Sequence, residues 1–223
     1  MKDDNRRTAI KGAIFDQDGL LFDTEVVFER SWLRAGEELG LPVTVQLTRS
    51  LSGCGRKELA IAIANAFPGI DPEILVERAH NLAAEAQMAM TPVIKPGVRE
   101  ILECCRRHGI RTAVASSSMR HLVDHNLAAT GLTGYFDEIV TGRDVENGKP
   151  APDIFLLAAF RIGVRPDQCI VFEDAFTGIR AAHAAGCQAV LIPDRTAPTA
   201  EILKICRTLP SLREAVRLIE QID

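Results

Sequence analysis

The sequence is poor in aromatic residues and has no block of basic residues. Phe, Trp and Tyr together make up 5% of the 223 residues, and the net charge is -4 at pH 7. Proteins that bind nucleic acids need positive charge for the phosphates and aromatic faces for the bases, so we expect no nucleic-acid partner. The chain also lacks an apolar run long enough for a membrane span or a signal peptide. We therefore expect a cytoplasmic protein that does not bind membranes.

The six cysteines are not arranged as metal-binding or redox pairs. No two of them have C-x-x-C spacing, and Cys104 and Cys105 are direct neighbours. This argues against zinc and favours buried or free thiols in a reducing compartment. The remaining composition, 47% hydrophobic and 25% charged, is typical of a globular protein with one large or two small cores. A monomer is the default expectation for such a chain.

Short β-branched segments alternate with helical patterns over the second half of the chain. Strands are expected at residues 111–115, 138–141, 169–172 and 189–192, and helices at 98–108, 120–130, 153–162 and 178–185. Such alternation predicts an α/β fold, a doubly wound, Rossmann-like parallel sheet with helices on both faces. Active sites of such sheets lie beyond the carboxyl ends of the strands.

A further strand, expected at residues 10–15, is separated from the others by a long segment without a convincing strand. The segment is too long for a simple connection, and residues 26–39, 49–66 and 71–89 within it have helical periodicity. We therefore expect an inserted, all-helical cap domain. The expected boundaries give a core of residues 1–22 and 93–223 and a cap of residues 23–92.

Four polar clusters follow four of the expected strands. They are Asp16 with Asp18, the serines at 116–118, Lys149, and Glu173 with Asp174. In a parallel sheet these groups would meet at one edge, where a divalent cation would relieve the repulsion between the carboxylates. Oxygen ligands without histidine or cysteine favour Mg²⁺, and a lysine with a hydroxyl indicates a phosphoryl group.

The two aspartates after the first strand can take different roles in phosphoryl transfer. One carboxylate attacks phosphorus, and the other donates a proton to the leaving oxygen and later takes one from water. Each cluster alone has a simpler interpretation: a turn for Asp16 and Asp18, a helix N-cap for the serines, a solvated loop for Lys149, and a charged helix start for Glu173 with Asp174. Only their order along the chain and their position after strands favour a common site.

The order of these motifs resembles the four-motif signature of the haloacid dehalogenase superfamily, whose members form an aspartyl phosphate. "DGLLFDTE", "GKPAPDIF" and "FEDAFTGIRAAHAAG" are similar to its β-phosphoglucomutase-like branch, which has a helical cap inserted after the first motif. The resemblance extends over nearly the whole chain. It implies a small phosphate ester as substrate and Mg²⁺ as cofactor.

The resemblance also implies a role for each motif residue. Asp16 would be the nucleophile and a Mg²⁺ ligand, and Asp18 the general acid and base that binds the metal through its backbone carbonyl. The phosphoryl group would be bound by Ser116, Ser117 and Lys149. The metal site would be completed by Asp174 and Glu173.

The reaction expected from these motifs is phosphoryl transfer from oxygen. Dehalogenases of the superfamily lack the second aspartate and phosphonatases replace it, so Asp18 disfavours both. We expect a phosphatase of small phosphorylated metabolites, most of all sugar phosphates, with a β-phosphoglucomutase as the alternative. Arg56 matches a phosphate-binding arginine of the mutase cap, whereas Phe28 replaces its cap histidine. A non-catalytic binding module is disfavoured because Asp16, Asp18 and Lys149 are all present.

Overall fold

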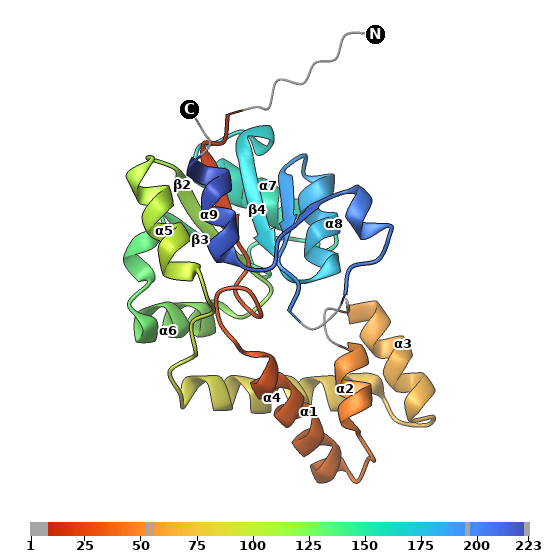
Figure 1. Cartoon of the computed structure of the whole chain (residues 1–223). Helices are drawn as coiled ribbons and strands as arrows, with labels where there is room; N and C mark the ends of the chain where they lie inside the picture. The colour runs from red at the N-terminus through yellow and green to blue at the C-terminus, as the bar shows by residue number, and fades with distance from the viewer. Residues whose placement is uncertain (1–8, 52–53, 55, 195–196, 221–223) are drawn as a thin grey trace.

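Six parallel strands form one sheet in the computed structural model of the chain (Figure 1). The structure describes residues 9–51, 54, 56–194 and 197–220, without the side chains of residues 56 and 57. The strands are β1 (Gly12–Phe15), β2 (Arg111–Ser116), β3 (Glu138–Thr141), β4 (Cys169–Glu173), β5 (Gln188–Leu191) and β6 (Arg207–Thr208). Their order, β3-β2-β1-β4-β5-β6, places β1 inside the sheet and confirms the expected doubly wound α/β fold.

Five of the described helices, all from residue 98 onward, flank the sheet. They are α5 (Val98–Arg107), α6 (Arg120–Thr130), α7 (Asp153–Arg161), α8 (Phe176–Ala184) and α9 (Leu212–Glu220). Short 3₁₀ helices lie at Thr133–Tyr135, Pro166–Gln168 and Ile202–Lys204. β6 and α9 were not expected from the sequence. Among the described helices, none combines the length and the apolarity that a membrane span requires.

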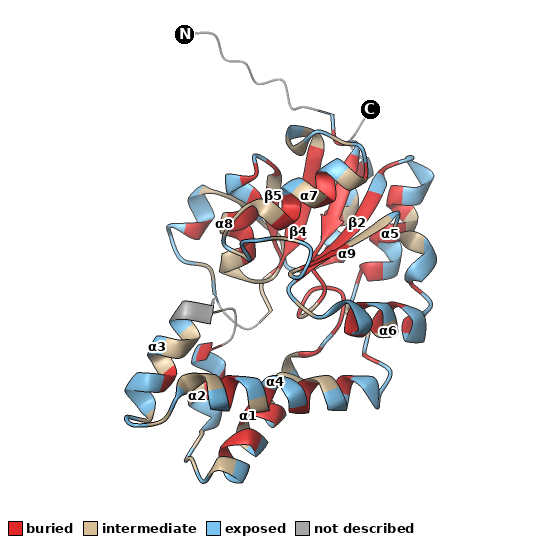
Figure 2. Cartoon of the chain, turned by 180° about the vertical axis from the view of Figure 1, so that it is seen from behind, coloured by how far each residue is buried: buried red, intermediate tan, exposed pale blue. Residues whose placement is uncertain are grey.

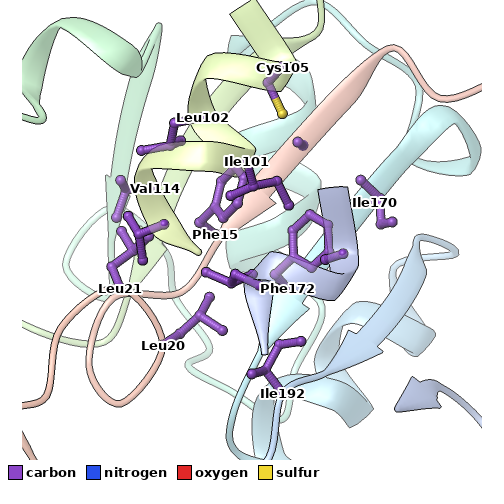
Figure 3. Packing of buried hydrophobic residues seen from close by; sticks show 14 of the residues in the cluster. Phe15, Leu20, Leu21, Ile101, Leu102, Cys105, Val114, Ile170, Phe172 and Ile192 are labelled. Atoms are coloured by element: carbon purple, nitrogen blue, oxygen red, sulfur yellow. The ribbon is translucent and has the colours of Figure 1, made fainter. Parts of the chain in front are cut away.

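Alternating side chains of the central strands supply two hydrophobic clusters, one on each face of the sheet. Phe15 and Phe172 point to the face covered by α5, α6 and α9, and their rings stack with centroids 5.1 Å apart. Figure 3 shows Ile101 of α5 next to Phe15, with Leu102 on the side of Val114 in the same cluster. Ile14 points to the opposite face, which α7 and α8 cover. The buried strands in Figure 2 therefore form the centre of three layers.

Four of the described helices, those between β1 and α5, form a separate layer beyond the carboxyl ends of the strands (Figures 1 and 2). They are α1 (Glu25–Leu39), α2 (Val45–Leu51), α3 (Arg56–Ala66) and α4 (Pro72–Met88). They share their own hydrophobic cluster, which includes Trp32, Leu75 and Leu82. The expectation of a single helix at residues 49–66 was wrong, because α2 ends at Leu51 and α3 begins at Arg56. The sequence of residues 52–55 contains two glycines, which disfavour helix.

Two paired segments of the chain connect this helical layer to the sheet. The backbone N–H of Lys95 donates to Leu21 O at 3.0 Å, and that of Asp23 donates to Val93 O at 2.9 Å. The outgoing and returning chains therefore run side by side. The domain boundaries expected at residues 22–23 and 92–93 fall within these paired segments and stay a prediction.

Candidate active site

The carboxyl ends of neighbouring strands bring polar side chains together. Asp16 follows β1, Ser116 ends β2 and Glu173 ends β4. β1 pairs in parallel with both other strands, and Phe15 lies opposite Phe172, so Asp16 and Glu173 leave the sheet at nearly the same level. The side chains of these three residues therefore meet at one edge of the sheet.

The Lys149 ammonium group lies at the centre of this edge. It comes from the loop between β3 and α7, and only 7% of its side chain is exposed. Its Nζ donates to Asp16 Oδ1 at 2.5 Å, to Glu173 Oε1 at 2.6 Å and to the Ala115 carbonyl at 3.0 Å. These three acceptors use the three hydrogens of the ammonium group. A solvated loop lysine, the simpler interpretation of the sequence, is thereby excluded.

Burial and charge both perturb this ion pair. Burial raises the pKa of Asp16 to about 8; the Lys149 ammonium opposes the rise, and the carboxylates of Glu173 and Asp18 add to it. Burial alone would lower the pKa of Lys149, but the two carboxylates beside it outweigh burial and raise that pKa. Lys149 is therefore a fixed positive charge, whereas Asp16 is surrounded by more negative charge than one lysine neutralises.

Asp16, Glu173 and Asp174 form a cluster of carboxylates. One oxygen atom of each lies within 4.8 Å of the others. Burial raises the pKa of Asp174 well above its usual range, and the carboxylates of Glu173, Asp16 and Glu25 raise it further. A set of hard oxygen donors with excess negative charge fits a cation such as Mg²⁺ and does not fit zinc. The cluster could therefore hold a divalent cation.

Two glycines make room for the acidic side chains. A Cβ atom at Gly178, in the first turn of α8, would lie 1.7 Å from Glu173 Oε1. A Cβ atom at Gly19 would lie 2.1 Å from Asp174 Oδ2, and Gly19 also has a positive φ of 81°. The Glu173 Oε2 atom in addition accepts the backbone N–H groups of residues 174 and 175, both at 3.0 Å. The backbone itself therefore holds the Glu173 and Asp174 carboxylates in position.

Asp18 lies beside the three clustered carboxylates and is held by two hydroxyl groups. Thr24 Oγ1 donates to its Oδ1 at 3.0 Å, and Ser118 Oγ donates to its Oδ2 at 2.6 Å. The Gln17 amide adds a longer contact of 3.4 Å to Oδ2. Asp18 therefore links the loop after β2 to the first turn of α1. A metal contact through its backbone carbonyl stays a prediction.

The three serines after β2 have different surroundings. Ser116 is fully buried, and its Oγ accepts the backbone N–H of Ser118 at 3.0 Å. Ser117 is exposed, whereas Ser118 is half-buried against Asp18. The simpler interpretation of the serines, a helix N-cap, is wrong: the N-cap residue of α6 is Met119, and no side chain caps the helix. The Ser116 hydroxyl instead accepts a backbone N–H, and the Ser118 hydroxyl donates to Asp18.

The two cap residues singled out from the sequence lie in different elements. Phe28 is half-buried in the first turn of α1, where its backbone N–H donates to Thr24 O at 3.1 Å. Arg56 is the first residue of α3, and its side chain lies outside the described residues. The substrate contacts expected for both side chains stay predictions.

Sequence reasoning missed Thr24 and Gly178, and it did not foresee the contact of Ser118 with Asp18. Thr24 and Ser118 lie within segments that the motifs singled out, but their shared contact with Asp18 joins positions six and one hundred residues away along the chain. Gly178 carried a weak signal of its own, since a glycine near the start of a helix is unfavourable without a packing reason.

Comparison with known proteins identifies the family. The chain matches the model of the haloacid dehalogenase-like hydrolases over residues 10–186. Fructose-1-phosphate phosphatase YqaB of Escherichia coli is 38% identical over 184 residues, which cover 80% of this chain and 94% of that protein. A phosphorylated carbohydrates phosphatase of Thermotoga maritima is 35% identical and covers 81% of this chain and 84% of that protein. These relatives support a phosphatase.

One further relative is much longer than this chain. The protein SUPPRESSOR OF QUENCHING 1, chloroplastic, of Arabidopsis thaliana is 36% identical over 199 residues, which cover 87% of this chain but only 19% of that protein. The similarity therefore concerns one part of the plant protein.

Solved structures agree in fold along the whole chain. A putative β-phosphoglucomutase of Thermotoga maritima has a TM-score of 0.74 at 30% identity and covers 96% of this chain and 100% of its own. A β-phosphoglucomutase of Clostridium difficile has a TM-score of 0.76 at 26% identity, with 96% of both chains covered. Because the family model matches most of the residues and two phosphatases align along most of their own length, this chain belongs to the haloacid dehalogenase-like hydrolase family.

Proposed function

We propose that the protein is a Mg²⁺-dependent phosphatase of small phosphorylated metabolites, above all sugar phosphates, that acts through an aspartyl-phosphate intermediate. The observation that carries the proposal is the buried contact of Lys149 Nζ with Asp16 at 2.5 Å and with Glu173 at 2.6 Å. A fixed cation beside a buried carboxylate can neutralise phosphoryl oxygens while that carboxylate attacks phosphorus.

In the proposed reaction the two aspartates act in turn. A carboxylate oxygen of Asp16 attacks phosphorus, the bond between phosphorus and the ester oxygen breaks, and Asp18 gives its proton to the leaving alcohol. Water then attacks the phosphorus of the aspartyl phosphate, and Asp18 takes a proton from this water. The bond between phosphorus and the Asp16 oxygen breaks, which restores the Asp16 carboxylate and releases inorganic phosphate. The short spacing of Asp16 and Asp18 supports this division of roles, as do the hydroxyl groups that orient Asp18.

Lys149 and the serines after β2 are the proposed phosphate ligands. Lys149 already has its ammonium group on the nucleophile, so its charge would act on the transferring group. Ser116 Oγ accepts a backbone N–H, which leaves its own hydrogen for a phosphoryl oxygen. Ser117 is exposed beside it and would bind from the solvent side.

The proposed metal ligands are Asp16, Asp174 and Glu173, with Asp18 contributing its backbone carbonyl. The close spacing of the three carboxylates supports this assignment. A bound Mg²⁺ ion would supply positive charge for the phosphoryl oxygens. Without it, burial, together with the neighbouring carboxylates, would keep Asp16 partly protonated and weaken it as a nucleophile.

The names of the relatives support sugar phosphates as the substrate class. They include a fructose-1-phosphate phosphatase and a phosphorylated carbohydrates phosphatase, together with hexitol phosphatase B of Escherichia coli at 29% identity. We propose that residues 23–92 form a cap domain over the site and that Phe28 and Arg56 contact the part of the substrate beyond the phosphate.

A panel of phosphorylated metabolites tests the proposed activity. We expect phosphate release with Mg²⁺ and none with a chelator, and Asp16→Asn should lower kcat by at least about a thousandfold because a covalent step is lost. The Asp124→Asn variant, whose carboxylate pairs with exposed Arg120 outside the site, is the matched control and should keep its activity. Full activity of Asp16→Asn would remove Asp16 as the nucleophile.

A β-phosphoglucomutase is the second candidate, favoured by the names of two similar solved structures. Phe28 argues against it, because a phenyl ring cannot exchange protons as the cap histidine of the mutase can. With β-glucose 1-phosphate and a bisphosphate primer, we expect steady release of phosphate and no glucose 6-phosphate. Accumulation of glucose 6-phosphate without phosphate release would establish the mutase instead.

We also propose that the protein works in the cytoplasm as a monomer. The proposal rests on its mildly acidic composition and on the bacterial relatives. Light scattering of the purified protein should give a mass near 24.3 kDa, and fractionation should recover the activity outside the membrane fraction. A mass near twice this value would contradict the monomer.

A further inference from the structure

The first turn of α1 is fixed next to the catalytic aspartates. Thr24 is buried, and its hydroxyl donates to Asp18 Oδ1 at 3.0 Å. The preceding residue, Asp23, donates its backbone N–H to Val93 O at 2.9 Å. α1 begins at the residue after Thr24, which is Glu25. The contacts of Thr24 and Asp23 therefore fix the backbone that carries the Glu25 side chain. Glu25 has no role in the reaction described above.

Glu25 lies on the face of α1 that turns towards the interior. Residues 25, 28, 29 and 32 follow the spacing of one helix face. Trp32 is buried in the hydrophobic cluster of the helical layer, and Phe28 is half-buried one turn closer to the site. The carboxylate of Glu29 pairs with Arg49 at 3.3 Å. Glu25 is half-buried and is the residue of this helix face that lies nearest the sheet. It therefore lies between the helical layer and the sheet.

The short segment from Gly19 to α1 brings the backbone of Glu25 close to the proposed metal site. Burial is the main cause of the raised pKa of Asp174, and Glu25 is among the carboxylates that raise it further. Asp174 in turn lies against Gly19, at the start of the short segment that leads to α1. The backbone contacts and the half-burial of Glu25 therefore put this residue on the side of the site nearest the helical layer, and its effect on Asp174 agrees with that position.

The leaving group of a bound ester must lie on this same side. In the proposed reaction the phosphoryl group contacts Asp16 and Lys149 at the sheet edge, and Asp18 protonates the ester oxygen. Asp18 is bonded to Thr24, the residue before Glu25. The carbon skeleton of the substrate would therefore extend from Asp18 past the first turn of α1.

We infer that Glu25 is a specificity-determining residue: its carboxylate accepts hydrogen bonds from hydroxyl groups of the leaving sugar or polyol and disfavours esters with a second anionic group there. The inference rests on the proposed function and narrows its substrate class to phosphates of neutral polyols and sugars. A carboxylate has several acceptor sites and no donor, so it suits neighbouring hydroxyls. A phosphate or carboxylate of the substrate in the same place would be repelled, which excludes competing metabolites.

Two matched pairs of substrates test the inference. Glycerol 3-phosphate and 3-phosphoglycerate differ only in a terminal hydroxymethyl or carboxylate group, as do sorbitol 6-phosphate and 6-phosphogluconate. We expect the wild type to have the higher kcat/KM for the neutral member of each pair. Glu25→Gln keeps the shape and removes the charge, and should reduce this preference about tenfold or more, as expected for loss of one charged contact.

The ratio within a pair separates specificity from general damage. Both members share the phosphoryl group and the metal, so any effect of Glu25→Gln on the Asp174 side of the site cancels in the ratio. Glu29→Gln, one turn further along the same face, is the control and should keep the wild-type ratio. Preference for the anionic members by the wild type would overturn the inference, as would a ratio unchanged by Glu25→Gln.

The proposed function can fail separately from this inference. Release of no phosphate by the wild type from these pairs, from the metabolite panel and from p-nitrophenyl phosphate would overturn both. Release with an unaltered ratio in Glu25→Gln would overturn only the role of Glu25 and leave the phosphatase intact.

Discussion

The Glu173 carboxylate is confined on every side that the structure describes. Its Oε1 accepts from Lys149 Nζ at 2.6 Å, and its Oε2 accepts from two backbone N–H groups. Gly178 lies on its remaining side, in the first turn of α8. A glycine there costs α8 about 1 kcal/mol relative to alanine. The glycine is therefore explained by the site and not by the helix.

Substituting this glycine tests that explanation. We expect Gly178→Ala to push the Glu173 carboxylate away from Lys149 and to lower kcat at least about tenfold, without the gain in stability that alanine gives most helices. Phosphate release and thermal unfolding measure the two effects. Gly134→Ala, at a position with open space and no positive φ, is the control. A Gly178→Ala protein with full activity and a higher Tm would contradict the packing argument.

Asp16 gives a second prediction at this scale, for the metal-free protein. The folded state raises the pKa of Asp16 from 3.8 to about 8 through burial, so the native chain holds a proton that the unfolded chain has lost. Its contribution to stability is fully present below about pH 4 and is lost as the pH rises towards 8. Relative to Asp16→Asn, the free energy of unfolding should fall by up to roughly 1 kcal/mol per pH unit in this range.

Urea denaturation with a chelator, at several pH values for both proteins, measures this difference. Mg²⁺ should reverse the trend, because it competes with the proton for the same carboxylate and binds more strongly as the pH rises. Parallel pH profiles of wild type and Asp16→Asn in the chelator would show that Asp16 titrates normally in the folded protein.

At the scale of elements, the end of α4 is attached to α6 by a buried polar contact. Asn126 Nδ2 donates to Gln87 Oε1 at 3.1 Å, and both side chains are almost completely buried. His125 adds a contact of 3.1 Å from its Nε2 to the Met90 carbonyl. Within the described part of the chain, the Gln87 Nε2 and Asn126 Oδ1 atoms have no hydrogen-bond partner. This contact joins the helical layer to the layer of the sheet.

A double-mutant cycle tests how much this contact stabilises the protein. Gln87→Met and Asn126→Leu each leave one buried amide unpaired, so each should lower the free energy of unfolding by about 1 to 3 kcal/mol. The double variant replaces both partners by apolar groups and should lose less than the sum of the two, by at least about 0.5 kcal/mol. Strict additivity in urea denaturation would mean that the two amides do not interact.

The elements themselves were predictable to the extent that periodicity and length define them. β2, β3 and α6 have strong patterns and were expected within one residue of their ends. The helix expected at residues 49–66 failed because its pattern continued across two glycines. The two residues of β6 are too few for any alternation, so pairing with β5 alone creates this strand.

At the scale of the whole molecule, the sheet edge was predictable but its contacts were not. Parallel strands bring their carboxyl ends together, which is why Asp16, Lys149 and Glu173 could be assigned to one site from their order along the chain. The contacts of Asp18 with Thr24 and Ser118 depend on how the helical layer sits on the sheet. Periodicity carries no information on that arrangement, and it is there that substrate selection by Glu25 is proposed.

Trapping the covalent intermediate tests the account most directly. Excess enzyme with Mg²⁺ is mixed with a sugar phosphate labelled with ³²P and quenched in acid within one turnover. The account predicts label on the peptide that contains Asp16, removed by hydroxylamine as expected for an acyl phosphate, and no label on Asp16→Asn. Turnover by the wild type at its normal rate without labelled protein, or with label on a peptide lacking Asp16, would contradict it.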